Sequence, residues 1–165
     1  MNTAVQVALW GLATCFPVVL SLMTHKLPAL GLSTMLLLGW AFGRLMAAFY
    51  GAPASMAMYP VMDALFGALA FMSWRQQREF WKLAMVGLFV AQCCGHVAFW
   101  LAYPEGGVPP DLAHDVIIRY IVANNVCFAL ELLCVAWAGG IGDVARDLGR
   151  WVSDRAGPRD HAGAS

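Results

Sequence analysis

Five long apolar runs dominate this chain, and each is about as long as a membrane-spanning helix. A span requires about 20 mostly apolar residues to cross the hydrocarbon layer. The runs cover residues 3–24, 28–50, 54–74, 82–103 and 116–138, and short links containing Pro and Gly separate them. The sequence therefore predicts an all-α membrane protein in which residues 1–138 form a bundle of five transmembrane helices.

The composition agrees with a lipid environment. Hydrophobic residues make up 61% of the 165 residues, and charged residues only 12%, whereas soluble domains average roughly 25% charged residues. A soluble domain of this size leaves too much of its surface outside to hide so many apolar side chains. The formal net charge is +0, which argues against nucleic acid as a partner.

Basic residues predict the orientation, because cytoplasmic links carry an excess of Lys and Arg. In a five-span arrangement, eight of the 10 basic residues fall on one side of the membrane. These eight are Lys26, Arg75, Arg78, Lys82, Arg146, Arg150, Arg155 and Arg159. We therefore expect a multi-pass protein of the inner (cytoplasmic) membrane, with its N-terminus outside and its C-terminus in the cytoplasm.

The pattern changes after Gly139-Gly140. Ile141, Val144, Leu148 and Trp151 recur at helical spacing, and charged residues fill the opposite face. Residues 141–156 are thus expected to form a cytoplasmic amphipathic helix on the membrane surface. A solvated helix, or one packed on the bundle, is an open alternative. The composition of the tail, residues 157–165, predicts disorder.

Polar side chains interrupt the apolar runs at similar depths. By helical rise, Arg44, Asp63, His96 and Asn124 lie about 9–14 Å below the outer ends of four different spans. We expect these residues to converge with their neighbours in one intramembrane polar site. Its members are Arg44, Tyr59, Asp63, Gln92, His96, Asn124, Asn125 and Glu131.

Two interpretations of this site stay open. The cluster could be interhelical glue, in which each contact contributes on the order of 1 kcal/mol. It could instead line a pathway, as ionisable groups inside spans commonly do. An Arg44–Asp63 ion pair is expected in either case, because a short link joins their spans.

Glu131 lies deeper than the other members, about 10 Å from the inner end of its span. No basic residue is available at that depth, and hydrocarbon favours the neutral, protonated carboxyl. The expected partners are hydroxyls, those of Ser21, Ser33 and Thr34. The carboxyl could then be a hydrogen-bond donor in a helix contact or a proton carrier.

Small residues recur every four positions along the second span, at Gly39, Gly43, Ala47 and Gly51. Such a ridge permits close approach of another helix. The partner helix could belong to the same chain or to a second copy.

No cofactor or metal is predicted. The five cysteines lie inside apolar runs, two of them adjacent, which is not the pattern of a disulfide framework. Cys93 and His96 offer at most two ligands on one helix, and the other histidines are placed unsuitably for haem. No nucleophile–base motif and no phosphate-binding loop is present, so an enzyme is the less favoured class.

Two functions follow as hypotheses. The first is a channel or carrier for an ion, a proton or a small polar solute. The alternative is a non-catalytic accessory or assembly subunit of a larger membrane complex, in which the polar cluster is structural. At this size, either a homo-oligomer or membership of a larger complex is expected, with the lipid bilayer as the common partner.

Overall fold

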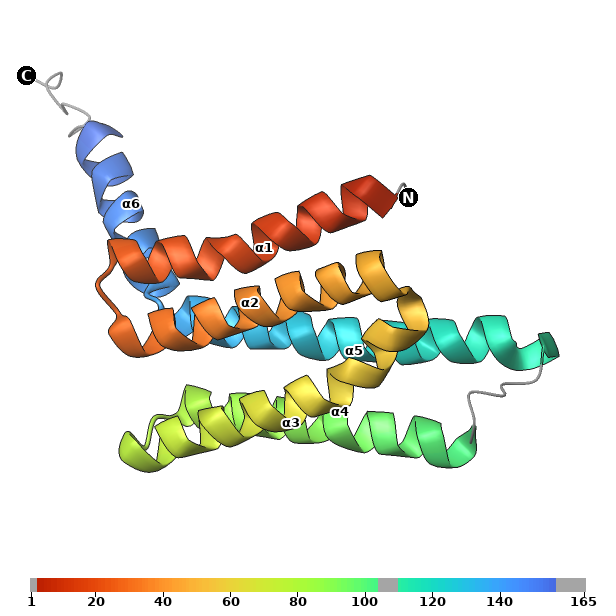
Figure 1. Ribbon diagram of the computed structural model, residues 1–165. Helices are drawn as coiled ribbons and strands as arrows, with labels where there is room; N and C mark the ends of the chain where they lie inside the picture. The colour runs from red at the N-terminus through yellow and green to blue at the C-terminus, as the bar shows by residue number, and fades with distance from the viewer. Residues whose placement is uncertain (1–2, 104–109, 157–165) are drawn as a thin grey trace, which may run out of the picture.

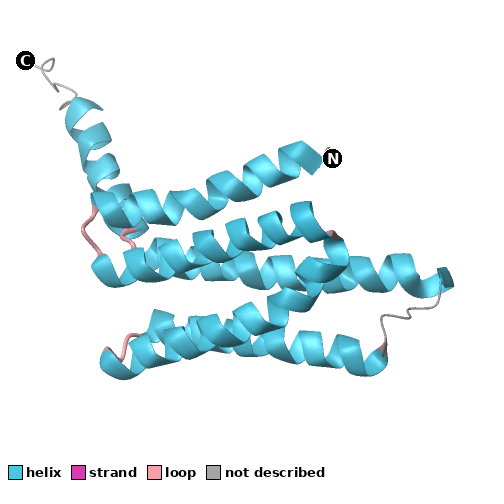
Figure 2. Cartoon of the chain, in the orientation of Figure 1, coloured by secondary structure: helices cyan, strands magenta, loops and turns pink. Residues whose placement is uncertain are grey.

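The chain folds into helices throughout the part that the computed structural model describes. That part comprises the backbone of residues 3–103 and 110–156, with side chains described for 4–51, 58–103 and 115–153. Six helices and no strand occur in it (Figures 1 and 2). They are α1 (Thr3–Met23), α2 (Leu27–Tyr50), α3 (Ala52–Gln76), α4 (Phe80–Ala102), α5 (Pro110–Ala138) and α6 (Ile141–Ala156). The predicted tail, residues 157–165, lies outside the described residues.

Helices α1 to α5 form an up-and-down bundle. Each of these helices packs on the next one along the chain. Helix α5 also packs against α1 and α2. One end of the bundle holds the α2–α3 turn and the start of α5, and the other holds the junction of α5 with α6 (Figure 1). We call these the α2–α3 end and the α5–α6 end.

Four of the described helices are long and apolar enough to cross a membrane: α1, α2, α4 and α5. The chain is therefore suited to a bilayer. Helix α3 is not among the four, although it too runs from the α2–α3 end towards the opposite end (Figure 1). Over residues 58–76, the part of α3 whose side chains the structure describes, Pro60, Asp63 and Arg75 lower the mean hydropathy.

The helices start and stop close to the ends of the apolar runs, with one clear difference. Helix α5 begins at Pro110, whereas its apolar run begins at 116. Hydropathy marks only the stretch that suits hydrocarbon, and a helix can continue beyond it. Proline is favoured in the first helical turn, where its missing N–H has no intrahelical partner in any case.

The apolar core lies between the middle of the bundle and the α5–α6 end. Its buried members come from α2, α3, α4 and α5: Leu32, Leu36, Ala70, Met85, Phe89, Leu132 and Val135. Many other apolar side chains point outwards on the first five helices and are exposed. Such an outer surface is unfavourable in water and suits contact with lipid tails.

The small residues of α2 face α3. A methyl group at Gly39 would collide with the Phe66 ring, and one at Gly43 would lie 2.9 Å from the Tyr59 ring. Gly51 does not continue this ridge, because α2 ends before it and its φ of 84° forms the turn into α3. Two of the four small residues thus give room to aromatic side chains of the same chain.

The α5–α6 junction is held by contacts with the end of α1. The Thr24 hydroxyl donates to the Gly139 carbonyl at 2.5 Å, and Gly140 turns the chain with a φ of 95°. Lys26 approaches the Asp143 carboxylate on α6 at 3.9 Å. Helix α6 then leaves the bundle at this end, at a steep angle to the other helices (Figure 1), with Val144 and Leu148 among its exposed apolar residues.

We predict that Gly39→Ala destabilises the protein by about 1–3 kcal/mol, which is typical of overpacking a filled site. The added methyl group needs the space that the Phe66 ring occupies. Titration of the purified protein from mild detergent into SDS, followed by circular dichroism, measures the loss.

Gly87→Ala on α4 is the matched control, since nothing lies within 4 Å of a methyl group there. It should cause no loss. The loss from Gly39→Ala should also shrink in a Phe66→Leu background. Equal effects at Gly39 and Gly87 would contradict this description of the α2–α3 contact.

Candidate functional site

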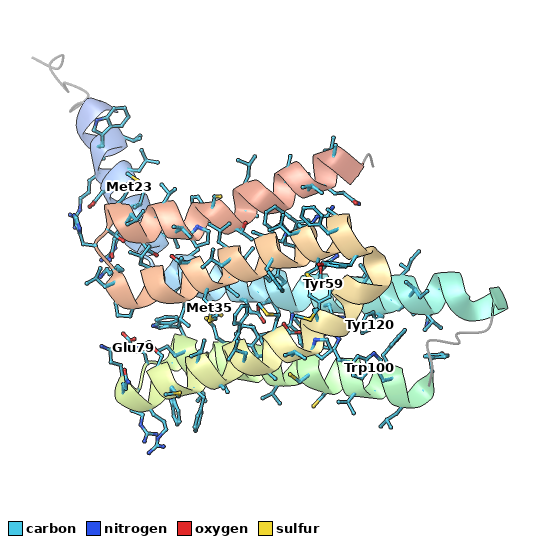
Figure 3. All side chains as sticks on the ribbon, viewed as in Figure 1. Met23, Met35, Tyr59, Glu79, Trp100 and Tyr120 are labelled. Atoms are coloured by element: carbon cyan, nitrogen blue, oxygen red, sulfur yellow. The ribbon has the colours of Figure 1, made fainter. Side chains whose placement is uncertain are left out.

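A cavity of about 390 Å³ lies among the first five helices. Every one of these helices contributes to its wall, with α5 contributing most residues. Figure 3 shows two of the lining residues, Tyr59 and Tyr120, lying close to each other towards the α2–α3 end, while Glu79 lies at the other end of the bundle.

All eight residues of the predicted polar site line this one cavity. The set comprises Arg44, Tyr59, Asp63, Gln92, His96, Asn124, Asn125 and Glu131. Arg44, Tyr59 and Asn125 are exposed at its edge, whereas Gln92, His96 and Glu131 are buried. The structure thus gathers polar side chains from α2, α3, α4 and α5 around a common space.

A chain of hydrogen bonds crosses the cavity wall from α3 to α5. The His96 ring on α4 is 2% exposed and lies at its centre. Its Nε2 is 2.8 Å from the Asp63 carboxylate, and its Nδ1 contacts the Tyr120 hydroxyl. The Tyr120 ring is stacked on Phe99 of α4, with centroids 4.4 Å apart. The imidazole is therefore fixed on both sides by partners from neighbouring helices.

The donor and acceptor capacities of the three groups give this chain a direction. An ionised carboxylate only accepts hydrogen bonds, so the Nε2–H of a neutral His96 donates to Asp63. Nδ1 is then the acceptor of the Tyr120 O–H. Each group is satisfied, which is what a buried polar network requires. Protonation of the ring would reverse the Tyr120 bond, because both ring nitrogens would then be donors.

One expected pairing within the cluster is wrong. No ion pair joins Arg44 to Asp63, whose carboxylate is paired with His96 instead. The Asn124 amide donates to the backbone oxygen of Tyr120 at 3.0 Å. That oxygen lies one turn away on the same helix, and such a local acceptor needs no particular placement of another helix.

The cavity continues past His96 to two buried groups that lack partners. Gln92 is 5% exposed and Glu131 is 1% exposed, and Oε1 of each has no hydrogen-bond partner among the described residues. The hydroxyl partners expected for Glu131 do not bond to it. The Ser33 hydroxyl donates to the Leu30 carbonyl of its own helix, and the Ser21 oxygen is itself unpartnered.

Aromatic rings surround this deeper part of the cavity. Trp10 of α1 and Phe128 of α5 lie 5.5 Å apart between centroids, and Phe66 and Phe89 meet edge to face at 6.2 Å. All four line the cavity, as does Trp40. The deep end is therefore an aromatic compartment with a carboxyl group in its wall.

The cavity is closed towards the α5–α6 end. Leu36 and Phe89 line it and also belong to the packed apolar core. At the other end its lining includes the exposed residues Gln6 and Ile121. The exposed lining residues thus lie towards the α2–α3 end of the cavity, and buried core residues line it towards the α5–α6 end.

Sequence reasoning missed Tyr120 and the cavity-lining tryptophans. Tyr120 lies four residues before Asn124, and this spacing, which places both on one helix face, is the signal that could have found it. Lys82 was expected in a cytoplasmic link, but it is fully buried, with Nζ 2.6 Å from Gln77 and 2.7 Å from Glu79. The charged head is satisfied by the turn that precedes α4.

Among the described residues, no group of three or more His, Cys, Asp and Glu side chains is arranged to hold a metal ion. Comparison with protein-family models, with curated proteins and with solved structures found no match for this chain. Interpretation of the cavity therefore depends on its own geometry and chemistry.

We predict that Tyr120→Phe destabilises the protein by about 1 kcal/mol. The change removes only the hydroxyl that bonds to His96, and hydrogen bonds between membrane helices average about 0.6 kcal/mol, with a maximum of about 1.7. The same SDS titration measures it. Tyr103→Phe is the control, because the Tyr103 hydroxyl forms no hydrogen bond to the residues that the structure describes and its ring packs on the same Phe99. Equal losses in the two variants would show that the bond to His96 contributes nothing.

Proposed function

We propose that this protein is a membrane carrier whose cavity takes up a small polar solute or ion, with the Asp63–His96–Tyr120 chain handling a proton. The observation that carries the proposal is the convergence of eight polar side chains from four helices on one cavity of about 390 Å³. Helix-to-helix glue requires pairs of groups in contact, not a space between them.

The hydrogen-bonded chain supports a role for protons. Relays inside membrane proteins are commonly built from Asp, Glu and His. In this chain an imidazole links a carboxylate and a phenol, and both ring nitrogens are engaged. Transfer of a proton onto His96 requires only that the Tyr120 hydroxyl change from donor to acceptor.

The closed deep end favours a carrier over an open channel. A channel needs a continuous path, whereas Leu36 and Phe89 join the floor of this cavity to the packed core. In a carrier, the site opens to one side at a time, and a vestibule closed at one end is what one such state looks like.

We further propose that α3 crosses the membrane with the four more apolar helices, which gives five spans. It runs from the α2–α3 end towards the opposite end, packed between α2 and α4 (Figure 1). Its Asp63 is paired within the bundle and is thereby shielded from lipid. Lys26, Arg75 and Arg78 then lie on one side, the cytoplasmic side, with α6 on the same membrane surface and the chain in the inner membrane.

We predict that purified protein in liposomes supports proton flux and that Asp63→Asn reduces this flux at least tenfold. Asparagine keeps an oxygen that can accept from His96 but removes the charge that stabilises a protonated ring. A pH-sensitive dye inside the vesicles, with valinomycin and potassium to balance charge, measures the flux after an imposed acid gradient.

Asp147→Asn is the control, because its side chain is 77% exposed on α6, away from the cavity. It should leave the flux unchanged. A flux that survives Asp63→Asn would remove Asp63 from the pathway. A wild-type flux no higher than that of empty vesicles would contradict the proton role and leave the polar cluster as a structural feature of an accessory subunit.

The five-span arrangement predicts which link residues face outwards. With the native cysteines replaced by alanine, Tyr103→Cys should react with an impermeant maleimide added to spheroplasts. Lys26→Cys and Arg78→Cys should be protected until the membrane is opened. Reaction of Arg78→Cys with protection of Lys26→Cys would show that α3 does not cross. Reaction of both would reverse the orientation.

A further inference from the structure

We propose that the deep end of the cavity binds the ammonium group of a small organic amine in its protonated form. This inference rests on the proposed carrier function, for which it names the class of substrate. It is based on three features: unpartnered oxygen atoms, a buried carboxyl group without a basic partner and a wall of aromatic rings.

The unpartnered atoms are acceptors. Oε1 of Gln92 and Oε1 of Glu131 are buried without a hydrogen-bond partner in the described part of the chain, and both residues line the cavity. A buried acceptor left without a donor costs about 1–3 kcal/mol. A ligand that supplies N–H groups would satisfy both oxygens, whereas a carboxylate, a phosphate or an ether would supply none.

The charges of the cavity favour a cation. Its lining includes the carboxyl groups of Asp63 and Glu131 and one guanidinium, that of Arg44. Asp63 is paired with His96, and Arg44 lies at the exposed edge. Glu131 has no basic partner among the described residues, and a buried carboxylate needs one. An ammonium group beside Glu131 would supply that partner and would favour the ionised carboxylate over the neutral form that burial alone favours.

The aromatic wall decides between an organic and an inorganic cation. Trp10, Phe66, Phe89 and Phe128 line the same compartment. Aromatic faces attract ammonium groups, and the attraction increases when the cation is desolvated. A hydrated metal ion would lose its water here for a few oxygens and no other hard ligand. The cavity is also large enough for a small organic molecule, since ligand pockets begin at about 300 Å³.

Equilibrium dialysis of radiolabelled benzylamine tests the proposal. The full-length protein in mild detergent is used near neutral pH, where the amine is protonated, and binding to protein-free micelles is subtracted. We expect saturable binding of one molecule per chain. Glu131→Gln, which keeps the shape of the side chain and removes its charge, should weaken binding at least tenfold. Asp147→Asn should not change it.

Competitors separate the features of the ligand. Benzyl alcohol, which is similar in size but neutral, should not displace the amine at tenfold excess. Benzyltrimethylammonium, which has the charge but no N–H, should compete more weakly than unlabelled benzylamine. Potassium at the same concentration should have no effect. Displacement by benzyl alcohol or by potassium would overturn the proposal in favour of an apolar or an inorganic ligand, and equal competition by the quaternary ion would overturn the role of Gln92 and Glu131 as acceptors.

Phe128→Leu provides a second variant, in case Glu131→Gln does not fold. It keeps the wall apolar and removes one π face, so benzylamine binding should weaken several-fold. Unchanged binding in both variants would contradict the site. This result is distinguishable from failure of the carrier proposal: absence of benzylamine binding alongside Asp63-dependent proton flux would refute only the amine, and binding without any flux would refute only the carrier.

Discussion

The architecture depends on one constraint, namely that a polar side chain removed from water must find a partner. In this bundle the constraint is met in three ways. His96 is satisfied on both sides by Asp63 and Tyr120 from other helices. Asn124 bonds to the backbone of its own helix, and Lys82 bonds to the turn before α4. Gln92 and Glu131 are the exceptions, since their Oε1 atoms have no partner among the described residues. The paired His96 and the unpartnered Gln92 and Glu131 line the same cavity. The deep end of this cavity is therefore a candidate for a ligand site.

The packing of the bundle creates this space and also closes it. Small residues on α2 let the Phe66 and Tyr59 rings of α3 approach closely, and both rings then form part of the cavity wall. Towards the α5–α6 end, branched and aromatic side chains fill the interior, with Leu36 and Phe89 shared between the core and the cavity. A change at Gly39 is therefore expected to affect both the stability of the fold and the shape of the site. The Phe66 and Tyr59 rings pack against α2 and also line the cavity, where a ligand could contact them.

Sequence reasoning came close to the cavity lining and failed on its pairings. Depth along a helix follows from residue number, because each residue adds about 1.5 Å, and so Asp63, His96 and Asn124 could be placed at similar levels. The rotation of one helix against another does not follow from residue number. Arg44 and Asp63 were expected to pair because a short link joins their helices, yet His96 takes the carboxylate. The place of Tyr120 does not follow from the sequence either, since an aromatic ring near the end of an apolar run suits both the membrane interface and the interior.

The sequence by itself determined the helical class, the approximate limits of the helices and the suitability of the chain for a bilayer. These properties depend on local composition and on the length of apolar runs, and both can be read along the chain. Only the tertiary structure decided which side chains meet: that His96 links Asp63 to Tyr120, that Glu131 has no hydroxyl partner, and that two of the small residues on α2 receive aromatic rings of the same chain. Such contacts join residues far apart in the sequence, and they are fixed by how the helices rotate and tilt to fill space, which no local pattern records.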